Sequence, residues 1–562
     1  MGHLLQLTCR EWADRTSHRV PQKGGTYKDI KYRELWEIVR GYAGALRELG
    51  LERGDRMAIF SENSFDWMMT DWAAQTLGVV PVPIYPTLPS DQALFVFQDC
   101  GAKIALCGST ELMARLAGER TMLLGELADK AKSSTISDED WQPLIDAVQF
   151  EDIATFIYTS GTTADPKGAM LSHRALTRMM MHIRDSFDLT ENDTWLGFLP
   201  LSHVMERVNG HFLPTAIGAT QCSAGSLASV GADMLKVQPT MVPVVPRFLD
   251  AMRSRIIDAM KKESGLKQKL FQMAMDQGKR KFLGQPAPLY GLTDALVGKK
   301  IRARTGGRLR FMVSGGAALP AHVAEFFGGF GILVLQGYGL TETCSGICVN
   351  QPDDSDYRTI GTPLSGVEMK IADDGEILIR GDCLMTGYYN RPEDTANAID
   401  PEGWFHSGDI GERRADGKFL ITDRKKDILV LGNGKNVAPQ PIENLLKESV
   451  YIQEAVLFGD GMEYCCALIV PDWAHVRTYA QQQGVQGGNE ADLMAAEPVR
   501  QLIKAEVAAA NKKLADFQKV KRFELVQGPF SVEGGELTPS LKVRRRVVKE
   551  RYLDLIQGMG RS

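Results

Sequence analysis

The sequence predicts an α/β fold in which parallel sheets are flanked by helices. Two observations carry this prediction. Segments with helical spacing of apolar residues alternate with short apolar runs typical of buried strands, and the alternation continues along most of the chain. At 562 residues the chain is also too long for one core, and a length of about 150 residues per domain suggests roughly three or four domain-sized units.

The first expected elements are a helix over 35–49, which is followed by Gly50 and Gly54, and a buried strand over 56–60. A further helix is expected over 73–77. The remaining strands of this part are expected at 79–84, 103–107, 153–158, 309–313 and 332–335. Residues 367–371 and 376–379 flank an Asp-Asp-Gly turn, which predicts a hairpin.

The pattern restarts after the charged segment 423–427, which lies between the strand-like runs 418–422 and 428–431. A helix over 442–446, a hairpin turning at 459–461 and an amphipathic helix over about 498–514 are expected beyond it. We therefore predict a large domain over residues 1–425 and a small α+β domain over residues 426–562.

Composition excludes several classes of protein. The formal net charge of −5 argues against a nucleic-acid binder, which depends on attraction to phosphates. Nine scattered cysteines without paired metal-ligand spacing predict a reducing compartment. The N-terminal residues lack a signal-peptide core, and no apolar run approaches the ~18 residues of a membrane span. We expect a cytoplasmic protein, with peripheral membrane contact and a homodimer left open.

The segment YTSGTTADPKG at 158–168 is the most informative one. It follows a strand-like run, and its small residues let backbone N–H groups approach an anion while Lys167 adds a positive charge. It is not a Walker loop, because Lys167 stands between Pro166 and Gly168 rather than before a Ser or Thr that opens a helix. Alone, the segment fits a phosphate-binding loop and an ordinary surface turn equally well.

Further motifs follow in a fixed order. They are QGYGLTET at 336–343, GWFHSGDIG at 403–411, DRKKD at 423–427, GKNVAP at 434–439 and LTPSLKVRRR at 537–546. In this order and spacing the set resembles the adenylate-forming superfamily, which includes acyl-CoA synthetases, peptide-synthetase adenylation domains and luciferases. Within it, VPRFL at 245–249, GGRLRFMVSGG at 306–316 and LTPSLK at 537–542 resemble long-chain fatty acyl-CoA synthetases.

The resemblance implies a large domain of stacked mixed and parallel sheets and a small, mobile C-terminal domain. It also implies two half-reactions: a carboxylate attacks the α-phosphorus of ATP to give an acyl-adenylate and pyrophosphate, and the thiol of coenzyme A then displaces AMP. Since little covalent chemistry falls to the protein, positioning and charge neutralisation must carry catalysis.

The resemblance also implies roles for individual residues. Lys542 would bridge the attacking carboxylate and the α-phosphate, Glu342 would hold Mg²⁺, Thr341 would donate to the α-phosphate, and His203 would stand beside the acyl carboxylate. For His203 we favour a pocket contact over proton chemistry. The expected ATP- and AMP-binding residues are Thr159, Ser160, Gly161, Thr162, Thr163, Lys167, Gly315, Gly316, Ala317, Gln336, Gly337, Tyr338, Gly339, Thr341, Asp409 and Arg424.

Lys426 would be the hinge on which the small domain rotates after adenylation. That rotation would bring a loop with Gly432, Gly434 and Lys435 to the coenzyme A side. One position departs from the family pattern, since Ala164 stands where relatives usually have glycine. If that residue needs a positive φ, alanine costs about 1 kcal/mol.

The stretch 253–300 is basic and ends in the apolar run 292–297. A solvated helical face explains it, and so does contact with a membrane that delivers a lipid. For the whole chain, two rivals accompany an ATP-dependent long-chain fatty acid–CoA ligase: a fatty acyl-AMP ligase that serves a carrier protein, and a nucleotide-binding regulatory module without catalysis. The absence of an extra insertion early in the small domain disfavours the first, and Glu342, Asp409 and Lys542 disfavour the second.

Overall fold

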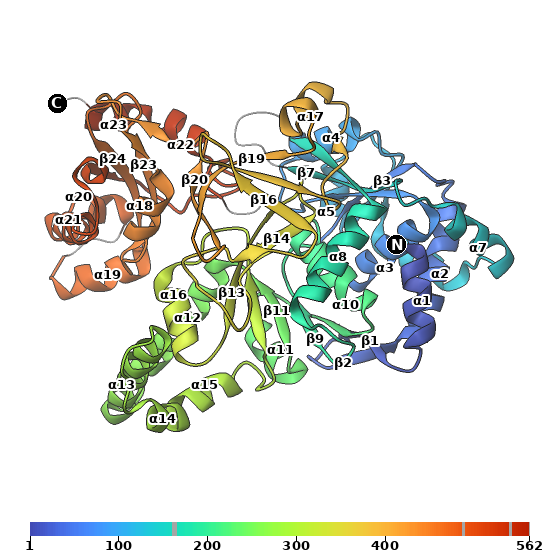
Figure 1. Ribbon diagram of the computed structural model, residues 1–562, viewed down its shortest axis with the longest axis horizontal. Helices are drawn as coiled ribbons and strands as arrows, with labels where there is room; N and C mark the ends of the chain where they lie inside the picture. Colours follow the sequence, from blue (N-terminus) through green and yellow to red (C-terminus); the bar gives the residue numbers. More distant parts are fainter. Residues whose placement is uncertain (160–165, 486–488, 539–541, 561–562) are drawn as a thin grey trace.

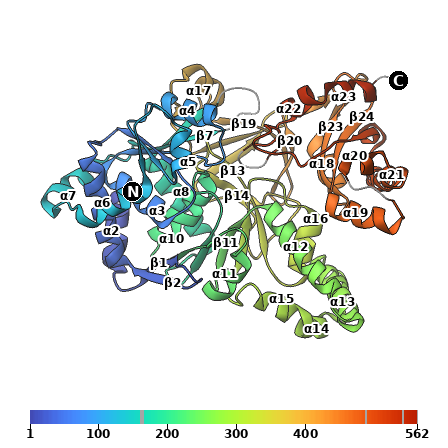
Figure 2. The same ribbon diagram turned by 180° about the vertical axis from the view of Figure 1, so that it is seen from behind.

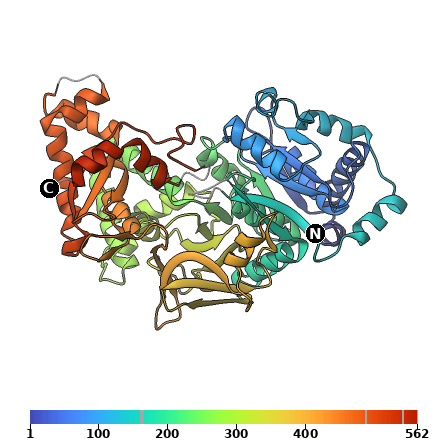
Figure 3. The same cartoon turned by 90° about the horizontal axis from the view of Figure 1, so that it is seen from above.

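The computed structural model of the protein describes residues 1–159, 166–485, 489–538 and 542–560, and Figure 1 shows it as a ribbon. The α/β fold class is confirmed. Helices pack on the sheets of a large N-terminal part, and the smaller C-terminal part, in orange and red, lies at one end (Figures 1 and 3).

A long mixed sheet crosses the large part in the order β15-β14-β13-β12-β11-β9-β10-β1-β2. The pairs from β1 through β10, β9, β11 and β12 to β13 are parallel, whereas β2, β14 and β15 add antiparallel edges. The strands are β1 (Thr16–Pro21), β2 (Tyr27–Lys31), β9 (Thr194–Gly197), β10 (Thr220–Ser223), β11 (Met241–Val244), β12 (Phe311–Ser314), β13 (Val334–Leu340), β14 (Ser345–Val349) and β15 (Thr362–Pro363).

Two further sheets lie beside each other near the N-terminal half. A parallel sheet has the order β4-β3-β5-β6, and an antiparallel one has the order β18-β8-β7, with β7 next to β4. Their strands are β3 (Arg56–Phe60), β4 (Val80–Ile84), β5 (Ala105–Cys107), β6 (Thr121–Leu123), β7 (Ile153–Thr159), β8 (Lys167–Ser172) and β18 (Gly387–Tyr388). The strands expected at 56–60, 79–84, 103–107 and 153–158 are confirmed within a few residues.

Amphipathic helices cover these sheets and bury their apolar faces in three apolar clusters. The helix expected at 35–49 is α2, and that expected at 73–77 is the end of the longer α3. The helices of this part up to residue 237 are α1 (Gly2–Glu11), α2 (Tyr32–Glu48), α3 (Phe65–Leu77), α4 (Ser90–Asp99), α5 (Thr110–Ala114), α6 (Leu124–Ser133), α7 (Asp138–Ala147), α8 (His173–Phe187), α9 (Val204–Glu206), the π-helix η1 (Arg207–Phe212), α10 (Leu213–Ala216) and α11 (Val230–Val237).

An arm of helices interrupts the long sheet between β11 and β12 and lies at the lower edge of the molecule in Figures 1 and 2. It consists of α12 (Pro246–Lys261), α13 (Gly265–Phe282), α14 (Tyr290–Thr293), the π-helix η2 (Asp294–Gly298) and α15 (Lys299–Ala303), and it packs on α16 (Ala321–Gly329). None of the helices in the described part of the chain combines the length and the apolar composition that a bilayer span requires.

An antiparallel sheet in the order β16-β17-β19-β20 follows the motif strands. Its elements are β16 (Val367–Ile371), β17 (Glu376–Gly381), α17 (Pro392–Ala398), β19 (Phe405–Arg413) and β20 (Phe419–Arg424). The hairpin expected around residues 373–375 is confirmed. In the register of β19 and β20, Asp409 stands opposite Arg424. This pairing brings the GWFHSGDIG and DRKKD motifs together.

The C-terminal part has its own apolar clusters. The hairpin expected at 459–461 and the helices expected at 442–446 and 498–514 are confirmed. The elements are β21 (Leu429–Val430), β22 (Asn436–Val437), α18 (Pro439–Leu446), β23 (Ile452–Phe458), β24 (Cys465–Pro471), α19 (Trp473–Gln482), α20 (Glu490–Ala495), α21 (Glu497–Asn511), the 3-10 helix η3 (Asp516–Gln518), β25 (Val520–Leu525), α22 (Arg545–Arg551) and α23 (Leu553–Gly560).

One expected element differs. The strand predicted at 332–335 was expected to end before the GYGLTE motif, yet β13 continues through it to Leu340. Residues 334–336 pair with β12, and residues 337–340 pair with β14 with a shift in register between Tyr338 and Gly339. A Cβ at Gly339 would collide with the backbone of Ser345, so glycine is required there. The sequence does not predict this half of the strand, because its glycines interrupt the alternation of apolar and polar side chains that indicates a strand.

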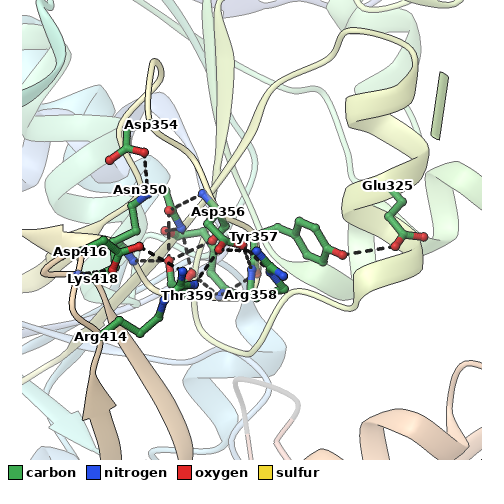
Figure 4. A network of polar contacts seen from close by, with 12 residues as sticks. Glu325, Asn350, Asp354, Asp356, Tyr357, Arg358, Thr359, Arg414, Asp416 and Lys418 are labelled. Atoms are coloured by element: carbon green, nitrogen blue, oxygen red, sulfur yellow. Dashed lines mark hydrogen bonds and ion pairs between the residues drawn. The ribbon is translucent and has the colours of Figure 1, made fainter. Parts of the chain in front are cut away.

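A polar network supports the back of this strand (Figure 4). Asp356 accepts hydrogen bonds from the guanidinium groups of Arg358 and Arg414, and these contacts hold its pKa well below the usual range. The amide of Asn350 donates to the Thr359 carbonyl at 2.8 Å. The same carbonyl accepts from Gln336 on β13, so the network fixes the strand that carries the motif.

Candidate active site

A cavity of about 710 Å³ lies between the large part and the C-terminal residues Thr538 and Lys542. Its walls come from strands and loops that are far apart in the sequence, which is the usual position of a small-molecule site. The residues expected from sequence that line it are Thr159, Lys167, His203, Gly315, Gly316, Gly337, Tyr338, Gly339, Thr341, Glu342, Arg424, Lys426 and Lys542.

Other expected residues lie elsewhere. Gln336 lies behind the wall, where its Oε1 accepts from the Leu319 backbone at 2.5 Å and its Nε2 donates to Thr359. Ala317 is exposed beyond the wall. Ser160, Gly161, Thr162, Thr163 and Ala164 lie outside the described residues.

Asp409 is buried behind the cavity wall, and two residues that line the cavity, Tyr338 and Arg424, contact its carboxylate. The Tyr338 hydroxyl donates to its Oδ2 at 2.6 Å, and Arg424 Nε contacts its Oδ1 at 3.0 Å. Burial and this carboxylate raise the pKa of the Tyr338 phenol, which therefore stays a neutral donor. Both carboxylate oxygens already have donors, so any ribose contact of Asp409 has to share or replace them.

Glu342 follows the end of β13 and presents its carboxylate to the cavity. Its Oε1 accepts from the Tyr388 hydroxyl at 2.7 Å, and the backbone N–H of Met385 donates to its carbonyl at 2.8 Å. These two contacts from the segment that includes β18 fix the side chain and the turn. The hydroxyl of Tyr388 is a neutral donor, because burial and the Glu342 charge raise its pKa.

Lys167 is held by two groups that the sequence did not reveal. Its ammonium contacts Asp394 of α17 at 2.5 Å and lies 5.3 Å from the centre of the Tyr388 ring. Asp394 also lines the cavity. The pair spans 227 positions of sequence, so no local pattern could have indicated it. The Asp394 carboxylate thus neutralises the positive charge of Lys167, which would otherwise be available to a phosphate.

Lys542 and His203 face the same cavity. Desolvation by the surrounding protein lowers the pKa of Lys542 to about 8, with the Arg424 guanidinium as a second cause, although the side chain remains exposed to the volume of the cavity itself. Burial, and then the Lys542 charge, lowers the pKa of His203 to about 4. His203 Nδ1 accepts from the Met205 backbone at 3.1 Å, so the neutral ring can donate from Nε2.

The loop expected on the coenzyme A side does not line the cavity. Gly432, Gly434 and Lys435 form the turn between β21 and β22, where Gly434 has φ of +78° and the Lys435 ammonium lies 4.8 Å from the Phe517 ring. The proposed hinge Lys426 does line it. In this arrangement Lys542 therefore occupies the cavity while the loop stays outside.

Part of the cavity lining is apolar. Val204, Met205 and Val313 contribute to it. Ile183 and Phe187 of α8, together with Met241 of β11, also line it and were not expected. The sequence did not indicate the two α8 residues, because the amphipathic pattern of α8 predicts that one face is buried but does not show which part of the protein that face contacts.

Glu206 is a further unexpected residue beside this pocket. Its carboxyl group is enclosed between Gly197 and Gly210, where a Cβ at either position would collide with it. Burial raises the pKa of Glu206 to about 8, so the group is largely protonated at neutral pH. It follows His203 by three residues and packs the loop that carries this histidine.

Comparison with known proteins places this geometry in a family. The model of the AMP-binding enzymes matches residues 6–389, and the model of the AMP-binding enzyme C-terminal domain matches residues 426–561. The chain belongs to the AMP-binding enzyme family. Long-chain-fatty-acid–CoA ligase FadD15 of Mycobacterium tuberculosis is 32% identical to this AMP-binding enzyme, covering 95% of this chain and 93% of the relative. Long chain acyl-CoA synthetase 6, peroxisomal, of Arabidopsis thaliana is 30% identical, with 97% and 83% covered.

Solved structures share the fold of this AMP-binding enzyme. ATP-bound MatB from Rhodopseudomonas palustris has a TM-score of 0.74 at 22% identity, with 99% of both chains covered. A Mycobacterium tuberculosis fatty acyl CoA synthetase has a TM-score of 0.66 at 22% identity, with 99% of this chain and 98% of that chain covered.

Proposed function

We propose that this protein is an AMP-forming long-chain fatty acid–CoA ligase. The observation that carries the proposal is the composition of one cavity, whose lining combines the charged residues Lys167, Glu342 and Lys542 with apolar residues such as Phe187 and Met241. Such a cavity suits a substrate with a carboxylate head and a long aliphatic tail, placed next to a nucleotide. The full-length similarity to long-chain acyl-CoA synthetases supports the same conclusion.

In the first half-reaction a carboxylate oxygen attacks the α-phosphorus of ATP, and the bond to the bridging oxygen of pyrophosphate breaks. Two negatively charged reactants must approach each other, so a cation between them lowers the barrier. Lys542 is proposed to supply this charge, with Thr341 donating to the α-phosphate and neutral His203 donating to the acyl carboxylate. Lys167 is proposed to bind the outer phosphates after it leaves Asp394.

The residues present fit a Mg²⁺ ion. Magnesium is commonly held by one or two carboxylates together with substrate phosphates and water, and Glu342 supplies one such carboxylate at the cavity. When bound, the ion neutralises charge on the phosphates of ATP. The chain itself keeps the Glu342 carboxylate in place through the Tyr388 hydroxyl.

In the second half-reaction the thiol of coenzyme A attacks the acyl carbon, and AMP leaves. We propose that rotation about Lys426, between a large domain of residues 1–425 and a small domain of residues 426–562, withdraws Lys542 and brings Gly432, Gly434 and Lys435 to the thiol. In the structure, Lys542 lines the cavity and this loop lies outside it. This supports two arrangements of the small domain, one for adenylation and one for thioester formation.

We propose the cytoplasm as the compartment, which the nine buried free thiols among the described residues support. The test of function is pyrophosphate release with acetate, octanoate, palmitate and coumarate, each with and without coenzyme A. We expect the highest kcat/KM for palmitate and formation of its thioester. Highest activity with acetate or coumarate would contradict the long-chain assignment, adenylate without thioester would favour the carrier-protein ligase, and no pyrophosphate at all would favour the regulatory module.

A further inference from the structure

The part of the helical arm beyond α12, residues 262–304, differs in charge from the rest of the molecule. It holds ten Lys and Arg residues against three Asp and Glu residues, whereas the whole chain has a net charge of −5. Among the described residues, no carboxylate lies within ion-pair distance of Lys269, Arg280 or Lys300. The arm therefore presents uncompensated positive charge.

The helix α13 of the arm has two distinct faces. Phe271, Ala274 and Gly278 are buried against α16, where the backbones of Gly278 and Gly329 touch so closely that neither position has room for a Cβ. Leu266 and Met273, two turns apart on the opposite face, are 80% and 42% exposed. This face therefore exposes large apolar side chains to solvent.

A second apolar row begins at Leu289, just before α14, and continues into η2. Leu289, Leu292 and Leu296 recur at helical spacing and are 44%, 58% and 43% exposed, while Thr293 between them is buried. Lys299 and Lys300 follow within the next turn and are exposed. The side-chain oxygen of Gln277 on α13 accepts from the Leu289 backbone at 3.0 Å, so α14 lies beside the middle of α13.

The base of the arm is firmly attached. Lys279 forms an ion pair with Glu325 of α16 at 2.8 Å, and Glu325 also accepts from the Tyr357 hydroxyl, as Figure 4 shows. Arg302 binds both carboxylate oxygens of Asp294 and the carbonyl of Phe330. The exposed leucines are therefore held on an ordered surface.

Exposed leucines bordered by lysines are the pattern of a surface that enters the headgroup region of an anionic bilayer. Exposure of the leucines to water is unfavourable, so they are more stable in contact with an apolar phase. The positive charge of the arm would repel a basic protein partner and attract an anionic surface. We propose that the arm is a membrane-docking surface for anionic lipid, with Leu266, Met273, Leu292 and Leu296 entering the headgroup region. The proposal deepens the proposed function, since a long-chain fatty acid resides in membranes.

The test is co-sedimentation of the full-length protein with 100-nm vesicles of phosphatidylcholine alone or with a third of phosphatidylglycerol. One variant combines Leu292→Ser with Leu296→Ser, and another combines Lys269→Glu, Lys299→Glu and Lys300→Glu. Matched controls are Leu227→Ser, at an exposed leucine outside the arm, and Lys504→Glu on α21. Size-exclusion chromatography with light scattering follows self-association.

The original protein and both controls should bind the anionic vesicles, and binding should weaken as salt rises. Each basic residue near an anionic surface contributes roughly fivefold in affinity, so the triple charge reversal should weaken binding by at least about 100-fold. The leucine variant should weaken it at least about tenfold. Turnover of octanoate, which needs no membrane, should be unchanged in both, so vesicle binding is tested separately from catalysis.

Equal binding by the arm variants and the controls would overturn the proposal, as would equal binding to vesicles with and without phosphatidylglycerol. A dimer that becomes monomeric in the leucine variant, without vesicle binding by the original protein, would also overturn it and assign the face to a second copy of the chain. Vesicle binding without any pyrophosphate release would retain the docking surface and refute only the proposed function.

Discussion

Lys542 gives the adenylation step a dependence on pH that can be worked out from the structure. Its pKa is lowered to about 8 by desolvation and by Arg424. The ammonium is then about nine-tenths protonated at pH 7 and about one-tenth protonated at pH 9. Since the proposed role needs the positive charge, kcat/KM for adenylation should fall roughly tenfold between these pH values. This ratio reports the free enzyme, whose pKa the structure describes.

Lys542→Arg should remove this decline, because a guanidinium stays protonated throughout the range. Lys542→Ala should reduce adenylation by on the order of several hundred-fold, the usual cost of one charge contact made in the transition state. It should spare thioester formation from supplied acyl-adenylate. The assay is pyrophosphate release from pH 6.5 to 9.5 at limiting fatty acid, with thermal unfolding measured at each pH.

Glu206 provides the necessary control, because burial raises its pKa to the same value of about 8 and it lies beside the cavity. Glu206→Gln keeps a neutral side chain of the same shape and should leave the decline in place. If the decline persists in Lys542→Arg but disappears in Glu206→Gln, the reasoning about Lys542 is refuted.

Three further predictions concern single sites. Asp394→Asn should lower the KM for ATP by about two- to fivefold, because it frees Lys167 and removes a negative charge, and the effect is small since both partners are about one-third exposed; an unchanged or higher KM in steady-state kinetics would contradict it. Lys426→Pro should allow adenylate to form but block its conversion, because proline fixes φ near about −65° at the proposed hinge; normal thioester production would exclude Lys426 as the hinge. Val313→Phe should reduce kcat/KM for palmitate at least about tenfold while retaining octanoate, since each methylene that loses its place costs about 0.8 kcal/mol; equal losses for both acids would place the tail elsewhere.

The sequence by itself determined the fold class, the order of the elements and many of the residues that line the cavity. It could do so because these features are local: apolar periodicity sets each helix and strand, and the motifs keep their functional residues within a few positions of one another. Glu342, Arg424 and Lys542 were therefore expected, and all three line one cavity.

Tertiary structure alone decided which groups these residues meet. The contacts of Asp394 with Lys167 and of Tyr388 with Glu342 join positions far apart in the chain, and the wall formed by Phe187 depends on where α8 packs. Gln336, although it stands in a motif, faces inward because β13 continues through that position and its amide completes a buried network. A local pattern fixes which face of a segment is apolar, whereas the partner of each polar group is set by packing between distant segments.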